Sequence, residues 1–98
     1  FMSAAVLPLS FAPQGALTMF TCTEALAEGR RMALKGPLLV DLAAVTEADS
    51  AALALILDWV RAARGAGQTI TVRNLPAGLV SLAALYGVDS LLPLEPTG

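Results

Sequence analysis

The chain has 98 residues, of which 56% are hydrophobic and 14% are charged, and its formal net charge is −2. This length predicts one domain over residues 1–98, large enough to bury a core without disulfide bonds, which the single Cys22 could not form within the chain. The acidic balance argues against nucleic acid as a partner, because nucleic-acid-binding domains carry a basic excess.

The apolar excess does not come from a membrane-spanning segment. Mean hydropathy is +0.70, yet the uncharged run 50–57 in the middle of the chain ends at Asp58, far short of the roughly 20 residues that cross a bilayer. Residues 1–9 have no Lys or Arg ahead of their apolar residues, unlike a signal peptide. We therefore expect a cytoplasmic protein without direct membrane insertion, part of whose apolar surface a partner covers.

The first third of the chain predicts two strands and a helix. Residues 4–11 are expected to form a strand, and Pro8 places it at a sheet edge. Residues 16–20 are predicted as a second short strand. Residues 21–24, Thr-Cys-Thr-Glu, have the spacing of a capping box, so a helix is expected to begin there and run to about Lys35.

The middle of the chain predicts a central strand followed by a long helix. Residues 38–42 are apolar in both alternating positions, as in a strand covered on both faces. A loop is expected over 43–48. A helical pattern then occupies 50–64 and ends at two glycines.

The last third predicts a strand, a helix and a short final element. Residues 68–73 alternate and are rich in β-branched side chains, which favours a strand. A helix is expected over 76–86, with Asn74 as a cap before it and Gly87 in a left-handed cap after it. Residues 88–94 are predicted as a short strand or a helical turn. The order of elements indicates the α/β class, with a mixed sheet and helices packed on it.

One broad face of the 50–64 helix is predicted to lie in the core. Its members are Ala52, Leu53, Ile56, Leu57, Trp59, Val60 and Ala63. The opposite face carries small apolar side chains with one acid and one base, namely Ala51, Ala54, Leu55, Asp58, Arg61 and Ala62. A solvated face usually carries more long polar side chains, so this composition favours a protein interface. The alternative is that alanine is simply a good helix former.

Asp49 and Ser50 stand at the predicted start of this helix. Either side chain could cap it, since both residue types accept hydrogen bonds from the first free amides of a helix. The Ser50 hydroxyl could instead contact a partner or be phosphorylated. Which of these three roles applies decides the function of the protein.

The reactive residue types do not form a catalytic set. The chain has no histidine, so no serine or cysteine can have an imidazole base beside it. Among the acids, only Glu47 and Asp49 are near each other in sequence, too few for a site that binds a hard metal ion. The glycines do not form a phosphate-binding motif. We therefore expect no enzyme, no cofactor and no metal.

Two segments resemble a known family. The run VDL at 40–42, Val45, and ADSAALAL at 48–55 resemble the core signature of STAS domains, the sulphate-transporter and anti-sigma-factor-antagonist family. The ending NLP at 74–76, LYGV at 85–88 and LLP at 91–93, together with Trp59, is most similar to the MlaB-like subunit of the bacterial phospholipid-transporting ABC complex. The chain departs from the family pattern at Ala43, usually serine, and at Ala52, usually glycine.

The resemblance implies a STAS-like mixed sheet of four to five strands with three to four helices. It places Ser50 at the position phosphorylated in anti-sigma antagonists, which in the transporter subunit lies at the contact with the ATPase. The expected function is a regulatory or scaffold subunit that binds this ATPase, peripheral to the inner membrane through its complex. The expected interface is Thr46, Glu47, Ser50, Ala51, Ala54, Leu55, Asp58 and Ala62.

Two other functions stay open at this point. One is an anti-sigma-factor antagonist, whose partner is a serine kinase that phosphorylates Ser50. The other is a small domain that binds a lipid or another apolar ligand. The apolar surplus also predicts that the isolated protein forms a weak homodimer through its partner face.

Overall fold

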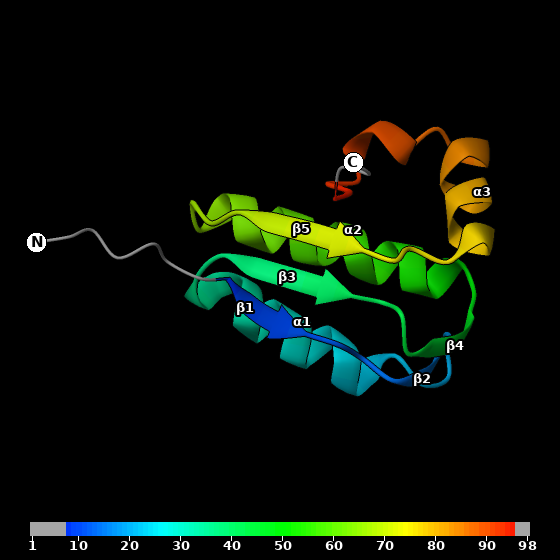
Figure 1. The fold of residues 1–98 in the computed structure, drawn as a ribbon, viewed down its shortest axis with the longest axis horizontal. Coiled ribbons are helices and arrows are strands. Elements are labelled where there is room, and N and C mark those ends of the chain that lie inside the picture. The colour runs from blue at the N-terminus through cyan, green and yellow to red at the C-terminus, as the bar shows by residue number, and fades with distance from the viewer. Residues whose placement is uncertain (1–7, 96–98) are drawn as a thin grey trace, which may run out of the picture.

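Three parallel strands form the main sheet (Figure 1). The computed structural model describes residues 8–95. Its strands β1 (Leu9–Phe11), β3 (Leu38–Asp41) and β5 (Ile70–Arg73) lie in the order β1-β3-β5. Each neighbour pair is parallel, and the registers place Phe11 of β1 opposite Val40. The α/β class is confirmed. The predicted sheet was mixed, but within residues 8–95 every pair of neighbouring strands is parallel.

A second, two-stranded parallel sheet extends the fold at one end. It consists of β2 (Gly15–Leu17) and β4 (Val45–Ala48). The prediction of a loop over 43–48 is therefore wrong for its last four residues, whose alternation is too short to signal a strand. Strand β2 is shorter than the predicted 16–20, because the chain turns after Leu17. Residues 4–7 of the first predicted strand lie outside the described residues.

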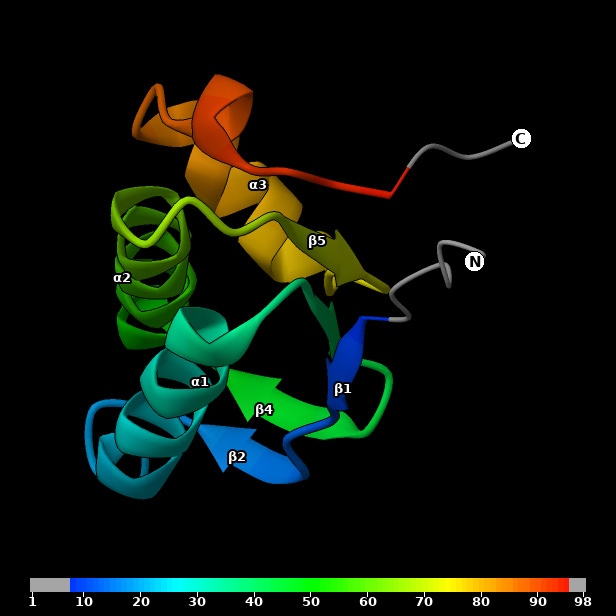
Figure 2. The ribbon, with the colours of Figure 1, turned by 90° about the vertical axis from the view of Figure 1, so that its left-hand side faces the viewer.

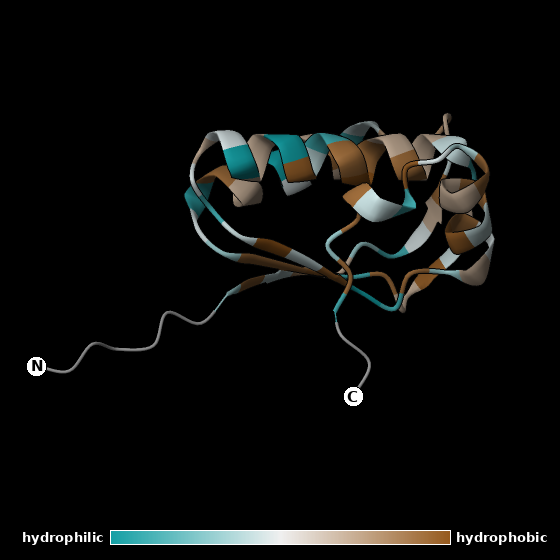
Figure 3. Cartoon of the chain, turned by 90° about the horizontal axis from the view of Figure 1, so that it is seen from above, coloured by the Kyte–Doolittle hydropathy of each residue, from teal (hydrophilic) through white to brown (hydrophobic). Residues whose placement is uncertain are grey.

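Two helices lie side by side on one face of the main sheet (Figure 2). They are α1 (Thr23–Lys35) and α2 (Ser50–Gly65), while α3 (Ala77–Leu85) packs against α2. Seen from above in Figure 3, the helices and the strands form separate layers. Two neighbouring parallel strands must be joined by a connection that crosses from one end of the sheet to the other, and here helices make these connections. In β1-α1-β3 and in β3-α2-β5 the helix runs back along the sheet, so α1 and α2 begin at the same end of the molecule.

The core lies between the main sheet and these helices. In β3, Leu38 and Val40 point into it, whereas Leu39 and Asp41 are half-buried. The prediction that this strand is covered on both faces is wrong for the described residues, because α1 and α2 lie on the same face. The predicted core face of α2 is confirmed for six of its seven members, and Leu57 is half-buried at the rim.

The helix ends differ from the predicted caps in two places. Cys22 is the N-cap of α1 and its side chain makes no capping hydrogen bond, so the predicted capping box is wrong. The Thr21 hydroxyl instead donates to the carbonyl of Ala16 at 2.9 Å. Before α3, Pro76 occupies the N-cap, while the side-chain amide of Asn74 donates to the Asp41 carboxylate at 2.9 Å.

The chain after α3 follows the prediction closely. Gly87 has a φ of 72°, the left-handed conformation expected at the end of this helix. Of the two alternatives for 88–94, the helical turn is confirmed as a 3₁₀ turn at Asp89–Leu91. No strand forms in these residues, and Leu94 makes only an isolated parallel bridge with Val72. Within residues 8–95, no helix is long and apolar enough to cross a membrane.

Candidate functional site

Asp49 joins the start of α2 to the turn between β2 and α1. Its backbone is extended, and one carboxylate oxygen accepts the amide of Ala51 at 2.8 Å, which makes Asp49 the N-cap of the helix. The other oxygen accepts the amide of Met19 at 3.2 Å. The two oxygens therefore satisfy two amides that the backbone leaves unpaired, one in α2 and one in the turn.

Ser50 is the first residue of α2 and is exposed. Because Asp49 supplies the cap, the structure does not use the Ser50 hydroxyl for that purpose. Within the described residues, its side chain makes no hydrogen bond. Of the three roles considered for this hydroxyl, capping is wrong, and contact with a partner or phosphorylation stay as predictions.

The turn that Asp49 holds carries two exposed apolar side chains. Met19 is 68% exposed and Phe20 is 88% exposed, the highest value among the large hydrophobic residues described. Sequence reasoning missed this feature, because it placed Phe20 in a strand. The available signal was a pair of large apolar residues flanked by threonines directly before a helix.

The structure brings together five of the predicted interface residues. Thr46 and Glu47 are exposed on β4, four and three positions before Ser50. Ala54 is exposed one turn farther along α2, and Ala51 is half-buried between them. This set, Thr46, Glu47, Ser50, Ala51 and Ala54, is called the α2-start surface below.

Three predicted interface residues lie elsewhere. Leu55 is 4% exposed and belongs to the core. It is buried because α3 packs against the side of α2 that the helical wheel predicted to be free for a partner. The half-buried Asp58 faces α1, where Arg30 donates to its carboxylate at 2.5 Å. Ala62 is half-buried, and its place twelve residues after Ser50 puts it about 18 Å away along the helix axis.

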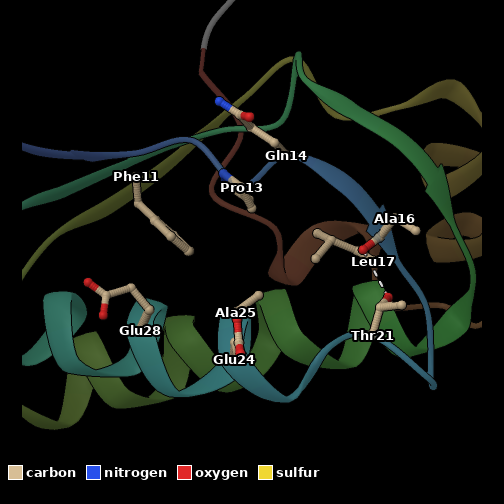
Figure 4. A pocket seen from close by; sticks show the side chains of 9 residues that line it. All are labelled: Phe11, Pro13, Gln14, Ala16, Leu17, Thr21, Glu24, Ala25 and Glu28. Atoms are coloured by element: carbon tan, nitrogen blue, oxygen red, sulfur yellow. Dashed lines mark hydrogen bonds between the residues drawn. The ribbon is translucent and has the colours of Figure 1, made fainter.

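A hollow of about 290 Å³ lies between the turn, β1 and α1 (Figure 4). Its lining comprises Phe11, Pro13, Gln14, Ala16, Leu17, Thr21, Glu24, Ala25 and Glu28. Of its two acids, Glu28 already pairs with Arg31. Within residues 8–95, no three Cys, Asp or Glu side chains are grouped to hold a metal ion. Among the described residues, the hollow therefore has no metal-binding set.

Asp41 and Arg73, the last residues of β3 and β5, and Glu95 have shifted pKa values. Hydrogen bonds from Asn74 and from the amide of Ala43 lower the pKa of Asp41. Arg73 donates to Glu95 at 2.7 Å, which lowers the pKa of that carboxyl and raises the pKa of the guanidinium. These shifts stabilise the ionised forms on the sheet side of the molecule, so they indicate structural ion pairs rather than acid–base catalysis.

The α/β arrangement of strands and helices agrees with the family to which the sequence is similar. Residues 11–93 match the family model described as Mlab, STAS domain. The chain belongs to this MlaB-like STAS family. STAS domains generally mediate protein–protein interactions and are generally non-catalytic, which supports a regulatory or scaffold role for this member. No curated protein sequence matches the chain.

Proposed function

We propose that this STAS domain is a non-catalytic cytoplasmic subunit that binds the ATPase of an Mla-type phospholipid-transporting ABC complex through the α2-start surface. The observation that carries the proposal is the exposed Ser50 hydroxyl, which the fold does not use because Asp49 caps the helix. The match to the MlaB-like family supports the choice of partner.

Small side chains make the α2-start surface suitable for close backbone approach. Ala51 and Ala54 follow Ser50 along α2, and neither has rotamer freedom to lose when a partner covers it. A phosphate on Ser50 would add nearly two negative charges beside Asp49. We therefore expect phosphorylation, or a glutamate at residue 50, to release the partner without unfolding the domain.

The test is the affinity of purified variants for the purified ATPase, measured by biolayer interferometry. Ser50→Glu and Ala54→Arg are expected to weaken binding at least tenfold, about 1.4 kcal/mol. Ser50→Ala, which removes only the hydroxyl contact, is expected to weaken binding by less than Ser50→Glu. Arg64→Glu, at the far end of α2, is the control for negative charge added away from the interface; it changes the charge by −2, against −1 for Ser50→Glu, and should still bind like the parent. Equal affinity of folded Ser50→Glu and the parent would refute the proposed interface.

A second candidate is an anti-sigma-factor antagonist that a kinase controls at Ser50. It is favoured by the exposure of this hydroxyl at a helix N-terminus, where a phosphate is electrostatically stabilised. The genes that neighbour the gene for this protein discriminate between the two functions. ATPase and permease genes support the transporter subunit, and a gene for a kinase-like anti-sigma factor supports the antagonist.

A further inference from the structure

We infer that the Met19–Phe20 turn inserts into an apolar pocket of the partner protein, and that Lys or Arg side chains border this pocket. The inference deepens the proposed function, because it adds a second contact next to the α2-start surface. Three observations on the turn carry it: its exposure, its rigidity and the charges around it.

The turn presents two adjacent, highly exposed apolar side chains. Phe20 is 88% and Met19 is 68% exposed, and among the other large hydrophobic residues that the structure describes only Leu85, at 76%, is as exposed as either. A phenylalanine and a methionine present large apolar areas, and aromatic side chains are common anchors at the centres of protein interfaces. Burial of both side chains in a partner would remove this area from water.

Hydrogen bonds hold the turn in one shape. The amide of Thr18 donates to the Thr21 hydroxyl at 2.9 Å, and the amide of Phe20 donates to the Thr18 hydroxyl at 3.3 Å. The Thr21 hydroxyl donates to the carbonyl of Ala16, and the amide of Met19 donates to Asp49. A turn ordered before binding loses less conformational entropy on docking than a flexible loop.

Asp49 makes the turn and the start of α2 one surface. The same carboxylate caps α2 at Ala51 and accepts the amide of Met19, so the turn lies directly beside Ser50. In Figure 1, β2, β4 and the beginnings of α1 and α2 meet at this end of the molecule. A partner that covers Ser50 therefore has the turn within its reach.

Charge around the turn selects the kind of partner. The exposed charged side chains on the segments next to the turn are acids, Glu24 in the first turn of α1 and Glu47 on β4, which pairs with β2. The basic residues of α1 and α2 lie in the second halves of these helices, toward the other end of the molecule. They are Arg30, Arg31, Lys35, Arg61 and Arg64. Acidic side chains around the turn repel an anionic bilayer, and they attract a protein pocket that Lys or Arg side chains border.

Photo-crosslinking in cells tests the inference without assuming the partner. Phe20 is replaced by p-benzoylphenylalanine, and the crosslinked peptide is identified by mass spectrometry; the same replacement at the exposed Tyr86 on α3 is the control. The expected product joins residue 20 to an apolar ATPase segment with a neighbouring Lys or Arg. Such a segment in another protein supports the docking turn and refutes the ATPase as partner. Crosslinks to lipid, to a second copy of the chain, or to nothing overturn the inference.

Binding measurements with the captured protein give a second readout. Met19→Ser combined with Phe20→Ser is expected to raise Kd about tenfold or more, while Leu85→Ser, which removes an equally exposed apolar side chain on α3, leaves Kd unchanged. Glu24→Gln combined with Glu47→Gln should reduce the salt dependence of the affinity. An unchanged Kd for the double serine variant overturns the inference.

Discussion

Gly29 of α1 lies so close to the indole ring of Trp59 on α2 that a Cβ at residue 29 would overlap with the ring. Trp59 is fully buried, and its indole N–H donates to the carbonyl of Leu26 at 3.1 Å. Its ring meets Phe11 of β1 edge-on, with 5.6 Å between the ring centroids. The missing side chain at residue 29 therefore sets how closely α1 approaches α2 and the sheet.

We expect Gly29→Ala to destabilise the protein by about 1–3 kcal/mol, because a wholly buried ring must shift to admit the methyl group. Urea unfolding followed by Trp59 fluorescence measures the loss. Gly78→Ala in α3 is the control, since a Cβ there meets nothing within 4 Å and alanine is a better helix former. Equal stability of the Gly29 variant and the parent would contradict the close contact.

Asp49→Ala is expected to cost about 1 kcal/mol for the lost cap, and more if the amide of Met19 stays unpaired. Asp49→Asn should retain most of the stability, since asparagine also caps well. By contrast, Ser50→Ala should change stability by less than about 0.5 kcal/mol, because the hydroxyl makes no hydrogen bond within the described residues. Chemical denaturation compares all three. A larger loss for Ser50→Ala than for Asp49→Ala would reverse the assignment of the cap.

Leu55→Ala is expected to destabilise the domain by about 2–5 kcal/mol, as for other buried leucines that leave a cavity. Ala54→Ser, at the exposed neighbouring position, should be nearly neutral. Thermal unfolding followed by circular dichroism measures both variants. If Leu55→Ala leaves the melting temperature unchanged, Leu55 lies on the surface, and the packing of α3 against α2 is wrong.

Acid should remove part of the stability that Asp41 supplies. Its pKa is lowered in the folded state by the hydrogen bonds from Asn74 and Ala43, so its contribution is complete above its unfolded pKa, about 4, and is lost as the pH falls through the lower folded value. The difference in Tm between the parent and Asp41→Asn should therefore shrink between pH 5 and about pH 2. A difference that stays constant with pH would show that Asp41 does not contribute through its charge.

Local patterns predicted most of the helices and strands. The helix over 50–64 and the strand over 68–73 have clear periods, and each lies within two residues of its observed bounds. Strand β4 was missed, because four residues with two exposed polar side chains look like a loop until β2 pairs with them. The capping box failed because the Thr21 hydroxyl bonds within the turn instead.

The candidate site was predicted at its centre but not at its edges. Asp49 and Ser50 follow from the motif at the helix start, and only the structure assigns the cap to one of them. Leu55 was wrongly assigned to the interface, because a helical wheel considers α2 alone and cannot show that α3 packs against it. The exposure of Phe20 depends on hydrogen bonds between residues up to thirty positions apart, which no local pattern contains.

The parallel order β1-β3-β5 also constrains how the chain folds during synthesis. Strand β3 lies in the middle of the sheet, yet its second neighbour, β5, begins at Ile70, after α2 has been made. Until then the apolar Leu38–Asp41 strand has one open edge, which can pair with another chain. Nascent chains that end before β5 should therefore aggregate readily, and the fold should form only after β5 has left the ribosome.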